Sequence, residues 1–336
     1  MKSSSIVQFS QKLSLRAAAN CLFIAIASLF SLSAQSQNYP NAPIRFIYPA
    51  GPGSILDVAF RSINEEAAKH LGQPIVQVNR AGAGGRTGFA EMMRAKPDGY
   101  TLGAVQSVTA VLQPLIDPVE WKADAGKDYT AIMLTFEYPL ILVAKKSAPY
   151  KDLPSFLKYA KDNPGKINAA SSGVGTGTHL GIAALNIAGG VNITHVPFAG
   201  NAPGLQSLVA GDVDVMWTDG AAKPFVDSGN LIALAVASST RWNMFPNVPT
   251  TLESGFGKII MQSWSAIGGP PGMSPAMVEK VTDAYSKVLA DPAVRAKLAI
   301  AGLSVIGGNA RDLNNRVIES RAIYEPLIRA TNVKRE

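Results

Sequence analysis

The chain has 336 residues, of which 47% are hydrophobic and 16% are charged, with 30 glycines, 22 prolines and one cysteine. A hydrophobic share of this size is ordinary for a globular protein, and the composition excludes a disordered chain and a coiled coil. The length predicts two domains, each large enough to bury a core of its own.

The formal net charge of +7 includes Lys2, Lys12 and Arg16 at the amino terminus. Without these three, 28 of the 31 basic residues remain against 24 acidic ones, a surplus of four. No run of Lys and Arg exceeds two residues. Because nucleic-acid binding needs a basic face along the phosphates, we expect no nucleic-acid partner.

The amino terminus predicts a secretory signal peptide over residues 1–36. A basic start precedes an apolar run at 21–32, and small residues follow at the −3 and −1 positions of two candidate cleavage sites, after Ser33 and after Ser36. The alternative is a transmembrane anchor, but a span takes about 20 apolar residues and this run is shorter. Cleavage removes Cys21, the only cysteine. We therefore expect an exported protein without disulfides or a thiol nucleophile.

From residue 39 onward, short apolar runs alternate with helical patterns. Most runs are continuous in hydrophobicity, which is typical of parallel strands buried on both faces. Strands that alternate with helices favour an α/β fold with mostly parallel sheets and flanking helices. The predicted strands cover residues 45–49, 75–79, 101–106, 140–144, 167–171, 193–197, 213–217 and 231–237.

Helix boundaries are marked by capping residues. Gly72 follows an apolar stripe at spacings of three and four and predicts the end of a helix. Ser274 and Asp291 each precede a proline, as a capping residue precedes the first helical position. The tail from residue 274 reads as nearly all helix. We expect the chain to cross between two lobes twice, so that residues 37–140 with 263–336 form one lobe and residues 141–262 the other.

Glycine-rich loops follow three predicted strands, at 50–57, 80–88 and 172–179, and each opens a helix. Ligands of open α/β sheets lie beyond the carboxyl ends of the strands. Glycine lets backbone N–H groups approach a ligand, and a helix start carries unpaired donors and partial positive charge. One such loop can simply be a tight turn between a strand and a helix. Three of them together favour a binding site for a carboxylate, phosphate or sulfate. Hydroxyl donors are available at Ser54, Ser107, Thr109, Ser172, Thr176 and Thr178.

Motifs for nucleotide binding and catalysis are missing. Residues 82–87 read G-x-G-x-x-T rather than G-x-G-x-x-G, and the chain has no P-loop and no G-x-S-x-G elbow. His70, His179 and His195 lack metal-ligand spacing. We expect His70 on the surface and His195 as a hydrogen-bonded core residue within a strand, while His179 either binds ligand or caps its helix. Asp219 could act as a general base, but the sequence shows no partner acid or nucleophile for it. We expect no enzymatic activity, cofactor or metal.

The chain resembles the Bug (TctC-like) substrate-binding receptors of the tripartite tricarboxylate transporter systems of Gram-negative bacteria. The resemblance covers residues 39 to about 327 and rests on segments in the family's order: YPNAPIRFIYPAGPGSILDVAFR, LGQPIVQVNRAGAGGRTG, AKPDGYTLG, ASSGVGTGTHL, THVPFAGNAP, AGDVDVMW and FPNVPTTLESGF. It implies a two-lobed periplasmic binding protein of type II-like architecture that closes on one small organic acid. The implied partners are membrane permease subunits, and we expect a monomer.

The resemblance also implies a site. Loops 50–57 and 172–179 match those that grip a ligand carboxylate in the family through backbone N–H groups, hydroxyls and bridging waters. Asp219 matches an acidic position that faces the ligand's variable end. The expected ligand-binding residues are Ala50, Gly53, Ser54, Ile55, Leu56, Asp57, Ser107, Thr109, Ser172, Gly173, Gly175, Thr176, Gly177, Thr178, His179, Phe198 and Asp219.

The first loop departs from the family pattern. A glycine run followed by Thr-Asp is usual, whereas Ser54, Ile55 and Leu56 precede the Asp here. Ala50 replaces a common aromatic residue and Ala199 a usual lysine. These changes predict a drier, less positive cavity, so we expect a monocarboxylate or an aromatic acid rather than citrate. Two other functions stay open: a sensory receptor that presents the acid to a membrane signalling protein, and a secreted hydrolase or transferase.

Overall fold

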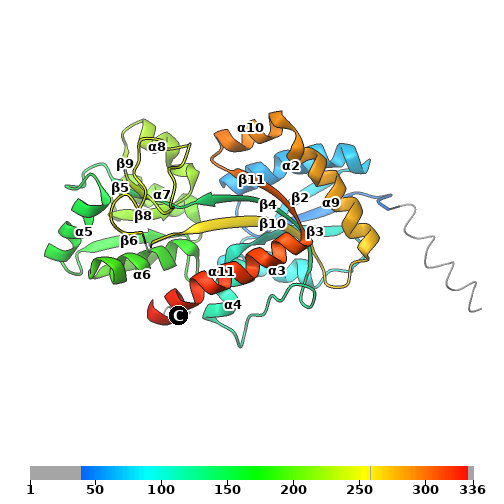
Figure 1. The fold of residues 1–336 in the computed structure, drawn as a ribbon, viewed down its shortest axis with the longest axis horizontal. Coiled ribbons are helices and arrows are strands. Elements are labelled where there is room, and N and C mark those ends of the chain that lie inside the picture. The colour runs from blue at the N-terminus through cyan, green and yellow to red at the C-terminus, as the bar shows by residue number, and fades with distance from the viewer. Residues whose placement is uncertain (1–38, 258, 332–336) are drawn as a thin grey trace, which may run out of the picture. The chain divides into compact units, whose positions relative to one another are not determined.

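Two mixed β-sheets with flanking helices organise the computed structural model, which describes residues 39–257 and 259–331 (Figure 1). The predicted signal peptide at 1–36 lies outside the described residues. Of the amino-terminal unit, residues 1–41, the structure describes only residues 39–41, which form neither helix nor strand. All elements below belong to the second unit, residues 42–336.

The first sheet has six strands in the order β11-β4-β10-β3-β1-β2. β1 pairs in parallel with β2 and β3, whereas β10 runs antiparallel to β3 and to β4, and β11 antiparallel to β4. The strands are β1 (Ile44–Tyr48), β2 (Ile75–Asn79), β3 (Thr101–Gln106), β4 (Thr130–Pro139), β10 (Gln262–Gly269) and β11 (Ser304–Asn309).

The second sheet has five strands in the order β7-β6-β8-β5-β9. β6 is parallel to β7 and β8, whereas β5 is antiparallel to β8 and β9. The strands are β5 (Ile141–Lys145), β6 (Ile167–Ser171), β7 (Ile193–Pro197), β8 (Val215–Thr218) and β9 (Leu231–Val236).

The α/β class predicted from the sequence is confirmed, but the sheets are mixed rather than mostly parallel. The predicted strands at 75–79, 101–106, 167–171 and 193–197 have the observed bounds, and the other four differ at their ends by one or two residues. Three strands were missed: β4, β10 and β11. Each pairs antiparallel, and polar residues or glycines interrupt the hydrophobic runs of β10 and β11.

The helices begin and end at the residues that cap them. The Ser54 side chain caps the helix that follows β1, and Gly72 ends it in the left-handed conformation, at φ 72°. Ser274 and Asp291 cap two helices as predicted. The helices are α2 (Ile55–Leu71), α3 (Arg86–Met93), α4 (Gln113–Ile116), α5 (Leu153–Asp162), α6 (Gly177–Gly189), α7 (Asn201–Ala210), α8 (Lys223–Asp227), α9 (Pro275–Ala290), α10 (Pro292–Ile300) and α11 (Ala310–Thr331).

The core of the first sheet is aromatic. Phe60, on the apolar stripe of α2, lies with its ring centroid 5.1 Å from those of Phe46 on β1 and Phe136 on β4. All three side chains are fully buried. Burial of one such side chain contributes about 2–3 kcal/mol, so this cluster fixes α2 against the sheet and, with it, the loop that opens α2.

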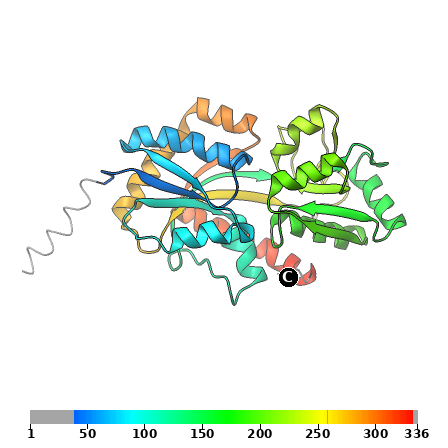
Figure 2. The ribbon, with the colours of Figure 1, turned by 180° about the vertical axis from the view of Figure 1, so that it is seen from behind.

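β4 and β10 run side by side from the first sheet toward the second, as both views show (Figures 1 and 2). β5 begins one residue after Leu140, and the Leu140 N–H donates to the Met261 carbonyl at 3.0 Å. The Ala237 N–H donates to the Leu140 carbonyl at 2.8 Å. The two connections between the sheets are therefore hydrogen-bonded to each other. Among the described residues, no helix has the length and apolar character needed to span a bilayer.

Candidate ligand-binding site

A cavity of about 570 Å³ is lined by residues that follow the carboxyl ends of both sets of parallel strands. Ala50 follows β1, Gly82 follows β2 and Ser107 follows β3. Ser172 and Phe198 follow β6 and β7 in the second sheet. Asp219, directly after β8, completes the arrangement, and Tyr138, Leu140, Ser263 and Trp264 contribute from the two connections. This is where open α/β sheets bind ligands.

The loop after β1 is held by hydrogen bonds to its own helix and to β2. Ser54 Oγ accepts the Asp57 N–H at 3.1 Å and lies 2.8 Å from the Tyr48 hydroxyl. Asp57 Oδ2 accepts the Gly53 N–H at 3.0 Å, and its Oδ1 accepts from the Asn79 amide at 2.8 Å. Burial raises the pKa of Asp57, but these hydrogen bonds and Arg61 outweigh burial and lower it. Asp57 is therefore an ionised group that shapes the loop.

The loop after β2 is shaped by buried polar side chains. The Gln113 amide donates to the carbonyls of Ala83, at 3.3 Å, and Gly84, at 3.0 Å. The approach is so close that a Cβ on Gly84 would lie 2.3 Å from Gln113 Nε2. Arg86 donates to Gln113 through Nε and to Asp117 through Nη1, the latter at 2.8 Å. This network presents the backbone of residues 82–85 to the cavity.

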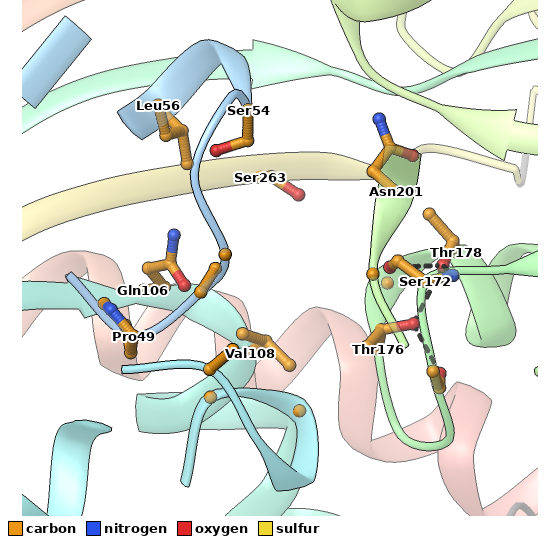
Figure 3. Close-up of a pocket in the computed structure, with 18 of the residues that line it drawn as sticks. Pro49, Ser54, Leu56, Gln106, Val108, Ser172, Thr176, Thr178, Asn201 and Ser263 are labelled. Atoms are coloured by element: carbon orange, nitrogen blue, oxygen red, sulfur yellow. Dashed lines mark hydrogen bonds between the residues drawn. The ribbon is translucent and has the colours of Figure 1, made fainter. Parts of the chain in front are cut away.

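The loop after β6 carries a cluster of hydroxyls (Figure 3). The Ser172 N–H donates to Thr178 Oγ1 at 2.9 Å, and the Thr176 and Thr178 hydroxyls lie 2.8 Å apart. Thr176 Oγ1 also donates to the Gly173 carbonyl at 2.7 Å and caps α6. In Figure 3 these side chains lie opposite Ser54, Leu56 and Val108, from the segments that follow β1 and β3.

Several of the expected ligand-binding residues do line the cavity: Ala50, Ser54, Leu56, Ser107, Ser172, Gly173, Thr176, Gly177, Thr178, Phe198 and Asp219. The structure places the others outside its lining: Gly53, Ile55, Asp57, Thr109, Gly175 and His179.

Local hydrogen bonding and packing explain why these residues lie outside. Asp57 and Gly53 bind each other, as described above. Thr109 is fully buried, and its hydroxyl donates to the Gln106 carbonyl at 3.1 Å. The Ile55 side chain packs toward Gly220, where an added Cβ would meet it at 3.0 Å.

Gly175 and His179 form a local contact of their own. The Gly175 N–H donates to His179 Nδ1 at 3.2 Å, and the His179 ring stacks on His195. His195 Nε2 lies 2.6 Å from Ser171 Oγ, so the predicted hydrogen bond of His195 is confirmed. The predicted core position is wrong, because His195 lies on the edge strand β7 and is only partly buried. His70 is exposed, as predicted. His179 therefore holds the loop at 172–178 through its contacts with Gly175 and His195, and it does not line the cavity.

Other lining residues were not among the expected ones: Tyr48, Pro49, Gly51, Ala81, Gly82, Ala83, Gly84, Gly85, Gln106, Val108, Tyr138, Leu140, Val174, Pro197, Ala199, Gly200, Asn201, Ser263 and Trp264. The glycine-rich pattern at 80–88 already marked the loop after β2. The residues of β4 and β10 had no such signal, because these strands were not predicted.

The fold and the site define a solute-binding protein of the periplasmic class. The structure of the periplasmic binding protein BugD superposes with a TM-score of 0.82 at 27% identity, over 89% of this chain and all of that one. Residues 59–333 match the model of the tripartite tricarboxylate transporter family receptor, and the chain belongs to this family.

Further relatives agree with this assignment. A Cupriavidus necator protein, "UPF0065 protein in gbd 5'region", is 35% identical over 79% of this chain and 80% of its own length. MatC from Rhodopseudomonas palustris, determined with bound malate, is 32% identical with a TM-score of 0.81, over 86% of this chain and 100% of its own. A second R. palustris protein, determined with adipate, is 25% identical with a TM-score of 0.82, over 88% and 99%.

Proposed function

We propose that this receptor captures one small organic carboxylate in the cavity and delivers it to a membrane transporter of the tripartite tricarboxylate type. The observation that carries the proposal is the convergence of helix amino termini. α6 and α7 begin at the lining residues Gly177 and Asn201, and Ser54 and Gly85, directly before α2 and α3, also line the cavity. Each brings unpaired N–H groups and about half a positive charge. Such a cavity suits an anion, and the malate and adipate bound to relatives are carboxylates.

The cavity also has an apolar side, which supports a monocarboxylate or an aromatic acid as ligand. Leu56, Val108, Leu140 and Phe198 line it. Ala199 lines it where the family resemblance implies a lysine. An aromatic ring gains from burial against such side chains, whereas citrate brings three carboxylates that need donors or cations.

Calorimetric titration tests this proposal. The protein is first freed of ligand by unfolding and refolding, and then titrated with benzoate-type acids, their methyl esters, and citrate. We expect one acid to bind with 1:1 stoichiometry and its ester, which lacks the anion, to bind at least tenfold more weakly. Equal binding of acid and ester would contradict the anion site, and tighter binding of citrate would contradict the ligand class.

The proposal extends to location and movement. We propose a periplasmic location, which the predicted signal peptide and the similarity to the periplasmic binding protein BugD support. A monomer whose two lobes, residues 37–140 with 263–336 and residues 141–262, close around the ligand accounts for tight capture.

A receptor also releases its ligand unchanged, so nuclear magnetic resonance spectra of the bound acid should show no product after prolonged incubation. Product formation would favour the hydrolase or transferase alternative.

A further inference from the structure

Two chain segments that belong to different sheets meet outside the strands that connect the sheets. The segment after β9 of the second sheet carries Trp242 and Met244, and the turn between α10 and β11 of the first sheet carries Gly302. Both views place α10 on one side of β4 and β10, with α11 on the opposite side (Figures 1 and 2). A contact just after α10 is therefore a further link between the sheets, to one side of the two connecting strands.

Trp242 makes the polar part of this contact. Its indole Nε1–H donates to the Gly302 carbonyl at 2.9 Å, and the two residues are 60 positions apart in the sequence. The indole is buried, and its ring centroid lies 5.3 Å from that of Phe245 in the core of the second sheet. Trp242 is thus fixed to the second sheet, while its N–H reaches a segment of the first.

Met244 makes the apolar part of the contact, because its thioether lies between two glycine backbones, one from each sheet. An added Cβ on Gly302 would lie 2.9 Å from Met244 Sδ and 2.6 Å from Trp242 Cζ2, and one on Gly220 would lie 2.6 Å from Met244 Sδ. The approach is too close for a side chain at either glycine. Gly220 directly follows Asp219, which lines the cavity, so the contact lies beside the cavity.

From this geometry we infer that Trp242, Met244 and Gly302 form a latch that holds the two sheets together beside the cavity and slows the escape of a bound acid. The inference rests on the proposed function, because it concerns how the receptor retains its ligand. Two lobes of one chain move relative to each other unless a large apolar interface joins them, and the connecting strands allow hinge motion. The latch consists of one hydrogen bond and a small apolar contact, so it breaks when the sheets separate on this side and re-forms when they close.

A matched pair of glycine variants tests the latch without any ligand. Gly302→Ala places a methyl group against Trp242 and Met244, whereas Gly272→Ala adds the same group where no atom beyond its chain neighbours lies within 4 Å. Both glycines have a left-handed backbone, with φ 81° and 89°, so the strain of the substitution is matched. Trp242→Phe is a second latch variant, because phenylalanine keeps a ring beside Phe245 but has no N–H for Gly302.

Double electron–electron resonance measures the separation of the sheets. Nitroxide labels are attached to cysteines introduced at the exposed positions Asp227 on α8 and Lys297 on α10, in the full chain with Cys21→Ser. We expect wild type and Gly272→Ala to share one narrow distance distribution, and both latch variants to show a broader one that extends to longer distances. An unchanged distribution in both latch variants overturns the latch. Unfolding of both, as a thermal melt would show, also overturns it, because the contact would then be required for the fold itself.

Dissociation kinetics test the retention of the acid. The probe is the acid that binds wild type most tightly in the calorimetric titration above, followed by stopped-flow fluorescence of Trp264, the one tryptophan in the described lining. We expect the dissociation rate constant of Gly302→Ala to exceed that of Gly272→Ala by at least about fivefold, an effect of the size that loss of one hydrogen bond gives, with association no slower. Equal dissociation rate constants overturn the retention role. Absence of binding by every acid contradicts the proposed function, while the distance measurement still decides whether the latch exists.

Discussion

The imidazole rings of His179 and His195 stack face to face, with centroids 3.8 Å apart and planes 9° from parallel. His179 lies in the first turn of α6 and accepts the Gly175 N–H, while His195 lies on β7 and contacts Ser171 at the end of β6. The stack therefore joins the hydroxyl-bearing loop at 172–178 to two strands. This arrangement disfavours the state in which both rings carry a charge, because two charged rings at this distance would repel each other.

Protonation of His179 should destabilise the fold. Burial, with a smaller contribution from His195, lowers the pKa of His179 from its ordinary 6.5 to about 4. The unfolded chain thus binds this proton more tightly than the folded one, so the stabilisation is complete above pH 6.5 and is lost as the pH falls toward 4. We expect about 1–3 kcal/mol from this group, less than the full shift because the ring is partly exposed.

Urea unfolding between pH 4 and 7 measures this effect. His179→Asn keeps an acceptor for Gly175 without the titration and should flatten the pH dependence. His70→Asn, at an exposed position, should leave the slope as in wild type. An identical slope in His179→Asn and wild type would contradict the prediction.

Replacement of Thr176 by valine should weaken both the fold and ligand binding. The hydroxyl caps α6 and donates to the Gly173 carbonyl, so its loss should cost about 1 kcal/mol of stability. Because Thr176 lines the cavity and its hydroxyl holds the loop through Gly173 and Thr178, its loss should displace the donors of the loop and weaken ligand binding by about 1–3 kcal/mol. Thr176→Ser retains the hydroxyl and serves as the control. Unchanged affinity in Thr176→Val would remove this side chain from the site.

Arg86 should position the glycine-rich loop without contacting ligand. It is buried and its ion pair with Asp117 is largely shielded from solvent. Arg86→Met leaves the Asp117 and Gln113 side chains without their partner, which should cost about 3 kcal/mol. Ligand affinity should fall as well, since Gln113 holds two carbonyls of the loop. Arg94→Met, at an exposed position, is the control, and equal denaturation midpoints for the two variants would refute this role.

Leu56 and Ile55 should differ in their effect on an aromatic ligand. Leu56 lines the cavity and is nearly fully buried, whereas Ile55 lies outside the lining. Leu56→Ala should weaken binding of an aromatic acid by about 1–2 kcal/mol through lost apolar contact. Ile55→Ala should leave the dissociation constant near the wild-type value. Calorimetry that finds equal losses for both variants would argue against an apolar wall at Leu56.

Local signals predicted much of the fold. Continuous apolar runs located β2, β3, β6 and β7 within their observed bounds, and capping residues such as Ser274 marked helix starts. Apolar runs and capping residues are both signals that arise from residues adjacent in the sequence. β4 and β10 were missed because their pairing partners lie more than 100 residues away and β10 lacks a continuous apolar run. The signal peptide and the lobe boundaries stay predictions.

The sequence likewise predicted only part of the candidate site. Glycine-rich loops after parallel strands indicated its location, and the hydroxyls of Ser172, Thr176 and Thr178 lie there. Sequence position did not show which way a side chain turns. Asp57 turns back to bind its own loop, and His179 turns toward His195. These orientations follow from contacts with β2 and β7, which no local pattern reveals.

A crystal structure of the protein with its tightest-binding carboxylate tests the central claim most directly. We predict that the carboxylate oxygens lie in the cavity and accept hydrogen bonds from the backbone or hydroxyls of both loops, residues 50–54 and 172–178. A carboxylate bound outside the cavity, or held by one loop alone, would contradict the account.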